Sequence, residues 1–226
     1  MGEKDTFLIA VDGVVFTIAH HELQILLIQR DAEPFKGIHA LPGGFLRKEE
    51  ELEDTIKRKL YEEANIKDIF LKKLHPFGKK GRDPRGRVIT IPYMALISSD
   101  KLEVKPRAKA TAAGWFCVYH LPELAFDHKE IIEDSLHHLR FEVQSTNLAY
   151  QLLSDKFTLT ELQQAYEIIL NQKLDKRNFR KRLLALGIVK STTHYKREGA
   201  HRPAQLYTFK DRQYSMLKEK INISFS

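Results

Sequence analysis

Residues 43–66, GGFLRKEEELEDTIKRKLYEEANI, constrain the chain more than any other stretch. Two glycines, which let a backbone pass close to a ligand and present N–H groups to phosphate, precede a charged run that predicts a helix over about 50–64. On that helix Lys59, Glu62 and Glu63 occupy positions i, i+3 and i+4, so they share one face. Carboxylates on one rigid face suit a hard cation such as Mg²⁺. Here an ammonium group stands among them and supplies the positive charge internally.

The same stretch resembles the Nudix box, G-x5-E-x7-R-E-U-x-E-E-x-G-U, where U is a bulky apolar residue. The matching residues are Gly44, Glu50, Arg58, Leu60, Glu62, Glu63 and Ile66. Lys59 replaces a glutamate of the pattern, and Asn65 replaces a glycine. Nudix enzymes cleave a nucleoside diphosphate joined to another group, and they need Mg²⁺ to neutralise charge and activate water. We therefore expect that this chain is not an enzyme and that it binds no cofactor. The alternative, which Lys59 disfavours, is that Glu62 and Glu63 still hold Mg²⁺.

Charge is divided unevenly along the chain. Residues 1–144 contain 22 Lys and Arg against 23 Asp and Glu, whereas residues 145–226 contain 15 against 7. All of the net charge of +7 therefore comes from the last third of the sequence. Such asymmetry predicts two domains, 1–144 and 145–226, of which the second meets a polyanion.

Several classes of protein are excluded or disfavoured by the remaining composition. A single cysteine, Cys117, rules out an intramolecular disulfide framework. No apolar run reaches the roughly 18 residues of a membrane span, and the N-terminal residues have no separate apolar signal region. We expect a cytoplasmic protein without a membrane partner.

The first domain has the pattern of a mixed α/β fold. Apolar, β-branched segments at 6–18 and 23–30 predict a hairpin, and further strands are expected at 88–97 and 115–119. The arginine-rich loop at 78–87 precedes the strand at 88–97.

The basic domain has the outline of a winged helix-turn-helix. Thr158 and Glu161 form a capping box that opens a helix to about residue 170, and Asp175 caps a second helix over 176–186. Gly187 is well placed to end that helix, and two strands with a polar loop between them follow as a wing. Arg, Asn and Lys on a recognition helix contact base edges and phosphates. The expected DNA contacts are Lys176, Arg177, Asn178, Arg180, Lys181 and Arg182 on the helix, and Lys196, Arg197 and Arg202 on the wing.

Stretches from end to end resemble the Nudix-related transcriptional regulators of the NrtR family. They include VDGVVFTI at 11–18, RDPRGRVITIPYMALI at 82–97, FTLTELQQAYEIIL at 157–170 and LDKRNFRKRLLALGIV at 174–189. The resemblance implies an α+β chain, with a Nudix-like α/β/α sandwich followed by a winged helix-turn-helix domain. It also implies that the first domain binds ADP-ribose or a related nucleotide, which changes affinity for operator DNA.

The resemblance places an effector pocket in the first domain. Its expected residues are Arg30, Phe35, Gly43, Gly44, Arg58, Glu62, Glu63, Arg82, Arg85, Arg87, Phe126, Asp127 and His128. The three loop arginines suit a diphosphate, because guanidinium groups make paired hydrogen bonds to phosphate oxygens. A loop held by local salt bridges to Asp83 is the competing interpretation.

Three functional hypotheses follow. The first is a homodimeric repressor of NAD-metabolism genes that binds a palindromic operator. The second is an active Nudix hydrolase whose basic module grips RNA or a nucleotide substrate; the Glu62–Glu63 pair favours it, and Lys59 and Asn65 disfavour it. The third is a regulator of the same architecture that senses a pentose.

Overall fold

The computed structural model describes residues 6–101, 112–197, 203–217 and 221. Contacts group the chain into two compact units. One unit contains Met1–Thr17, Gln24–Ile97 and Leu102–Leu136, and the other contains Ile18–Leu23, Ser98–Lys101 and His137–Ser226. The contacts divide the chain inside a helix, so the boundary expected at residue 144 stays a prediction.

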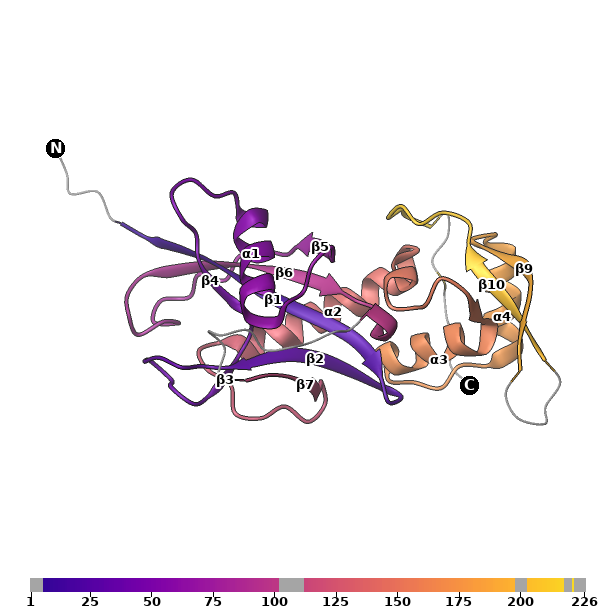
Figure 1. The fold of residues 1–226 in the computed structure, drawn as a ribbon, viewed down its shortest axis with the longest axis horizontal. Helices are drawn as coiled ribbons and strands as arrows, with labels where there is room; N and C mark the ends of the chain where they lie inside the picture. Colours follow the sequence, from indigo (N-terminus) through magenta and orange to yellow (C-terminus); the bar gives the residue numbers. More distant parts are fainter. Residues whose placement is uncertain (1–5, 102–111, 198–202, 218–220, 222–226) are drawn as a thin grey trace. The chain divides into compact units, whose positions relative to one another are not determined.

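A seven-stranded mixed sheet forms the first unit (Figure 1). Its strand order is β3-β2-β1-β6-β5, with β4 paired to β1 and β7 paired to β2. The strands are β1 (Leu8–Ala19), β2 (Glu22–Gln29), β3 (His39–Ala40), β4 (Gly43–Phe45), β5 (Phe70–Lys73), β6 (Val88–Leu96) and β7 (Ala113–Cys117). The short 3-10 helix η1 (Ser99–Lys101) follows β6. The strands expected at 6–18, 23–30, 88–97 and 115–119 are confirmed, with shifts of one or two residues at most ends.

The centre of the sheet is buried on both faces. Strands β1 and β6 run parallel in a register that begins with Leu8 opposite Val88. Helix α1 (Leu52–Ala64) and the first part of α2 (His128–Ser145) lie on opposite faces of this sheet (Figure 1). Because helices cover both faces, the central strands are apolar runs rather than alternating patterns. The layered α+β arrangement predicted from the sequence is confirmed.

Helix α1 ends at Asn65, the residue that replaces the glycine of the Nudix pattern. Asn65 adopts φ 57 and ψ 27 in the left-handed region, and its N–H donates to the Tyr61 carbonyl at 3.0 Å. The Ile66 N–H donates to the Leu60 carbonyl, which completes the helix end. Asparagine tolerates this conformation better than other non-glycine residues. The substitution at Asn65 therefore preserves the backbone turn and does not argue against hydrolysis.

The second unit contains a three-stranded sheet and two consecutive helices. The sheet has the order β8-β10-β9. Besides η1 and the second part of α2, its elements are 3-10 helix η2 (Leu148–Gln151), β8 (Phe157–Thr158), α3 (Leu159–Leu170), α4 (Lys176–Ala185), β9 (Val189–Lys196) and β10 (Ala204–Phe209). Helix, turn, helix and two-stranded wing appear in the predicted order, so this part of the fold is confirmed.

Local signals in the sequence fix the ends of these two helices. Both bonds of the Thr158–Glu161 capping box are present at the start of α3. The Asp175 carboxylate accepts from the Asn178 N–H at 2.8 Å and caps α4. Gly187 follows α4 with φ 63, a backbone conformation that glycine adopts without strain.

Among the described residues, no helix combines the length and the apolar character that a membrane span requires.

Candidate functional site

A cavity of about 220 Å³ opens beside strand β4 of the first unit. Its walls come from strands β1, β2 and β4, helix α1, the loop before β6, and the start of α2. The charged side chains in its lining are Arg30, Lys59, Arg82, Arg85, Asp12, Asp31, Glu63 and Asp83. A Cβ atom added to Gly43 would lie 2.4 Å from the Val11 carbonyl oxygen, so only glycine fits this wall.

Lys59 occupies the centre of the carboxylate cluster on α1. Its ammonium group forms a close ion pair with Glu63 Oε1 and lies 3.8 Å from Glu62 Oε2. The other Glu63 oxygen accepts from the Gly43 N–H at 3.1 Å. A Cβ atom on Gly44 would lie 2.8 Å from Lys59 Cε, so Gly44 leaves room for the lysine stem. Burial raises the pKa of Glu63, and Lys59 and the Gly43 N–H partly offset that effect.

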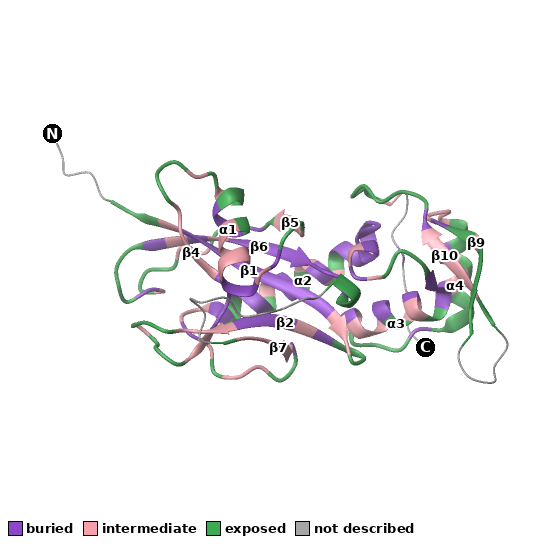
Figure 2. Cartoon of the chain, viewed as in Figure 1, coloured by how far each residue is buried: buried purple, intermediate pink, exposed green. Residues whose placement is uncertain are grey.

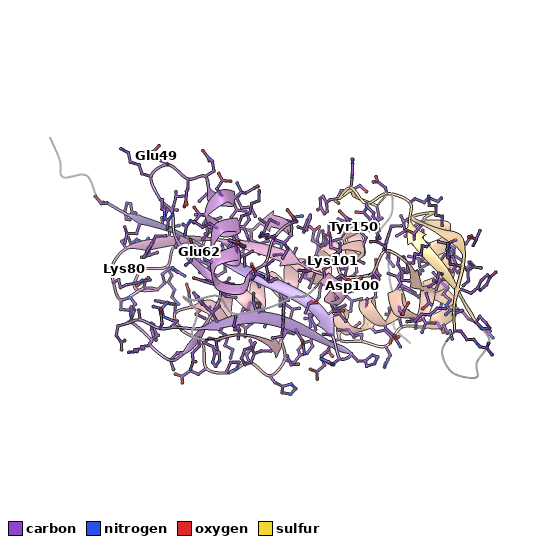
Figure 3. All side chains as sticks on the ribbon, viewed as in Figure 1. Glu49, Glu62, Lys80, Asp100, Lys101 and Tyr150 are labelled. Atoms are coloured by element: carbon purple, nitrogen blue, oxygen red, sulfur yellow. The ribbon has the colours of Figure 1, made fainter. Side chains whose placement is uncertain are left out.

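Arg58 ties the preceding loop to helix α1. Its guanidinium donates to both oxygens of Glu50, at 2.6 and 2.8 Å, and to Glu62 at 3.3 Å. The hydrogen bonds from Arg58 lower the pKa of Glu50 to about 2. Glu62 projects from α1 (Figure 3), and one of its oxygens lies near both Arg58 and Lys59. All three carboxylates retained from the Nudix pattern, those of Glu50, Glu62 and Glu63, are therefore paired with Arg58 or Lys59.

The three loop arginines have different environments. The Arg82 side chain is buried, with 4% of it exposed, and donates two hydrogen bonds to Asp127 at 2.7 and 2.6 Å. Arg85 pairs with Asp83 at 2.7 and 3.0 Å, but 39% of its side chain is exposed. Arg87 donates to the Gly78 carbonyl and lies outside the lining of the cavity. The alternative interpretation of this loop predicted salt bridges to Asp83, and Arg85 forms such a salt bridge.

Phe126 lines the cavity, and two guanidinium groups lie near its ring. The centre of its ring is 4.8 Å from Arg30 Cζ and 5.3 Å from Arg85 Cζ. Phe35 contacts the same ring edge to face, with 4.8 Å between centroids. Both phenylalanines have positive φ, at 56 for Phe126 and 66 for Phe35. Such backbone conformations are unfavourable for bulky residues and cluster at ligand sites.

Arg30 organises the loop that carries Phe35. Its guanidinium donates to the Pro34 carbonyl at 2.8 Å and to the Ala32 carbonyl at 3.3 Å. Arg30 therefore shapes the rim of the cavity as well as lining it.

A buried polar network forms the floor of the cavity. His128 Nδ1 accepts from the Leu41 N–H at 2.9 Å, and Nε2 faces Asp12 Oδ1 at 3.7 Å. Asp12 also accepts from the Thr90 hydroxyl at 2.7 Å. Burial lowers the pKa of His128, so the ring is neutral and carries its proton on Nε2. This network connects β1, β6 and the start of α2.

The lining of the cavity coincides in part with the effector residues expected from the sequence. Eight expected effector residues line the cavity: Arg30, Gly43, Gly44, Glu63, Arg82, Arg85, Phe126 and His128. Five others lie outside its lining: Phe35, Arg58, Glu62, Arg87 and Asp127. Asp12, Asp31 and Phe45 line the cavity and were not expected. Asp12 interrupts the apolar run of β1, and a buried carboxylate in such a run is a signal that the sequence did contain.

Helix α4, which carries six of the expected DNA contacts, has both exposed and buried residues (Figure 2). On α4, Lys176, Arg177, Asn178 and Lys181 are exposed, while Phe179 and Leu183 are buried as the inner stripe requires. Arg182 is half-buried, Arg197 is exposed, and Arg202 lies outside the described residues.

Two of the candidates bond to α3 instead. Arg180 donates to the Thr160 hydroxyl at 2.9 Å, and Lys196 donates to Glu161 at 2.6 Å.

Comparisons with known proteins agree with this two-part description. Residues 7–135 match the NUDIX domain, and residues 149–209 match the NrtR DNA-binding winged helix domain. The chain is 37% identical over 211 residues to the "ADPR responsive transcriptional repressor NtrR" of Acinetobacter baylyi, covering 92% of this chain and 84% of that protein.

Two solved structures from Shewanella oneidensis are also similar. NrtR complexed with a 27mer DNA has a TM-score of 0.79 and 34% identity, covering 89% of this chain and 93% of that one. The NUDIX domain of NrtR complexed with ADP ribose has a TM-score of 0.54 and 35% identity, covering 60% of this chain and 90% of that one. A Nudix domain and an NrtR winged helix in one chain, with a relative matched over most of its length, show that this chain belongs to the NrtR family of Nudix-related transcriptional regulators.

Proposed function

We propose that the chain is a transcriptional repressor of NAD-metabolism genes whose Nudix domain senses ADP-ribose or a related nucleotide. The observation that carries the proposal is the pairing of Lys59 with Glu63 and Glu62 in a chain that also presents an exposed basic helix. A cavity with neutralised carboxylates suits binding without cleavage. The relatives support it, since one is described as an ADPR-responsive repressor and others were crystallised with DNA and with ADP ribose.

The carboxylates of α1 do not fit a catalytic Mg²⁺. This ion requires near-octahedral coordination by oxygen ligands. One Glu63 oxygen is paired with the Lys59 ammonium group, and the other accepts from the Gly43 N–H. A metal would have to displace the ammonium group and then tolerate its charge nearby. Without a metal to activate water, the domain binds its nucleotide and does not hydrolyse it.

Two cationic side chains are suited to hold the diphosphate. Lys59 lines the cavity beside Gly43 and Gly44 of strand β4. Arg85 lines the cavity with a partly exposed guanidinium, which can bind phosphate oxygens in a bidentate manner. The exposed part of the Phe126 and Phe35 pair offers an aromatic surface for the base.

The winged helix would act as one half of a homodimer. Two recognition helices match two operator half-sites that are about 34–36 Å apart, one helical turn of DNA. An effector that changes this spacing changes DNA affinity, and the coupling is reciprocal: DNA must change effector affinity by the same factor. A repressor acts where the genome is, so we place the chain in the cytoplasm.

Calorimetry combined with a gel shift tests the proposal. ADP-ribose should bind the purified protein equally well in EDTA and in Mg²⁺, with little release of AMP, and should change the affinity for a duplex that the protein selects from a random pool. Cleavage of ADP-ribose at an ordinary enzymatic rate of about 10 per second would instead support the hydrolase alternative. That alternative is favoured by the retained Glu62–Glu63 pair. Binding of arabinose with no response to ADP-ribose would identify a pentose sensor.

A further inference from the structure

The first turn of helix α3 binds the wing through Glu161, which uses both of its carboxylate oxygens. Oε2 accepts from the Thr158 N–H at 2.7 Å, which caps α3. Oε1 accepts from the Lys196 ammonium group at 2.6 Å, and Lys196 is the last residue of wing strand β9. One carboxylate therefore connects the start of α3 to the far end of the wing strand.

Helix α4 is bonded to the same turn of α3. The Arg180 guanidinium donates to the Thr160 hydroxyl at 2.9 Å, and Arg180 is only half-exposed. Thr160 and Glu161, here called the α3 anchor, therefore contact both parts of the DNA-binding surface. Arg180 and Lys196 are basic, yet each points a donor at α3.

We propose that Arg180 and Lys196 are positioning residues, which hold α4 and the wing at a fixed spacing through the α3 anchor, while Arg177, Asn178 and Lys181 contact the DNA. The proposal rests on the DNA-binding function proposed above. It assigns two basic residues of the module to geometry rather than to phosphate contact.

The chemistry of Glu161 supports this division. Partial burial acts to raise its pKa, but hydrogen bonds from Lys196 and from Thr158 outweigh burial and lower it, so the carboxylate stays charged. An unpaired carboxylate near a polyanion would weaken binding by repulsion. The ion pair with Lys196 neutralises the negative charge of the Glu161 carboxylate. If Lys196 left Glu161 to contact a phosphate, the exposed carboxylate would oppose the gain.

The direction in which Glu161→Gln changes DNA affinity distinguishes the two possible roles of Lys196. Glu161→Gln keeps an oxygen that can cap α3 but removes the charge that holds Lys196. If Lys196 positions the wing, Glu161→Gln and Lys196→Gln should each weaken DNA binding by up to about fivefold, the range of an exposed ion pair, and the double variant should be no worse than either. If Lys196 contacts phosphate, Glu161→Gln should strengthen binding, which would overturn the proposal.

Salt dependence gives a second readout that a phosphate contact would change. Loss of one phosphate contact lowers the slope of log affinity against log salt by about 1, whereas loss of a positioning residue leaves it unchanged. Thr160→Val should likewise weaken binding without changing the slope. Asp155→Asn is the control, since Asp155 is another carboxylate of the second unit that forms an ion pair, with Arg212 rather than with Lys196. A reduced slope in Lys196→Gln would contradict the proposal.

Hydrogen exchange tests the anchor without DNA. In the free protein, Glu161→Gln should speed amide exchange in β9, while Asp155→Asn should not. The probe for binding is a duplex selected by the wild-type protein from a random-sequence pool. If the wild-type protein selects no duplex, the proposed function fails, and exchange in β9 still decides whether the anchor holds the wing. Unchanged exchange in β9 of Glu161→Gln would overturn the anchor itself.

Discussion

Replacing Arg82 with alanine should lower the stability of the Nudix domain even when no ligand is present. The Arg82 side chain is 4% exposed, and those of its partners Asp127 and Asp12 are 9% and 10% exposed. Removing the guanidinium leaves two buried carboxylates without their cation. Breaking a buried pair in this way costs about 3–5 kcal/mol. At about 2–4 °C per kcal/mol for a chain of this size, the unfolding temperature should fall by about 6–20 °C.

Tryptophan fluorescence is the appropriate assay. Trp115 is the single tryptophan and lies on β7 of the first unit, so its emission reports unfolding of the Nudix domain. Arg87→Ala is the control, because Arg87 is exposed and should change stability by no more than about 0.5 kcal/mol. An Arg82→Ala protein that keeps its unfolding temperature and loses only ADP-ribose binding would refute this reasoning and would make Arg82 a ligand contact.

Four further outcomes are expected. Lys59→Glu should create Mg²⁺ binding measurable by calorimetry, because it replaces the internal cation with an oxygen ligand; no binding would mean that other features disable the site. Arg85→Ala should weaken ADP-ribose binding by about 1.5–3 kcal/mol, the range of a charged hydrogen bond, and should also lower the unfolding temperature, because it removes the ion-pair partner of the buried Asp83 carboxylate. The logarithm of the DNA affinity should fall with the logarithm of the salt concentration with a slope near −5 if about 6 phosphates are neutralised. Arg177→Ala should weaken the free energy of DNA binding by roughly 1–3 kcal/mol if Arg177 reads a base. A DNA affinity that does not depend on salt would contradict the role of the basic helix. The pKa of Glu50 is lowered to about 2 by Arg58, so its contribution to stability should be present above about pH 4.5 and be lost as the pH falls towards 2, and Glu50→Gln should remove that dependence in acid titrations.

Periodicity and capping signals determined the secondary structure. The Thr158–Glu161 box, the Asp175 cap and Gly187 each act within a few residues, so their outcome could be predicted from the sequence. The glycines before α1 and the charged face of that helix were also local signals. For the same reason the ion pairs of Lys59, which join residues three and four positions apart, followed from helix geometry.

Tertiary structure decided which arginines are accessible. Arg82, Arg85 and Arg87 look alike in the sequence, because a composition pattern carries no information about burial. Asp127 is 45 residues away from Arg82 along the chain, yet folding brings their side chains together and buries them. The same holds for the α3 anchor, where Lys196 meets Glu161 across 35 residues. Local propensity fixes the helices and strands, but only long-range packing determines which charges remain in contact with solvent and available to a ligand.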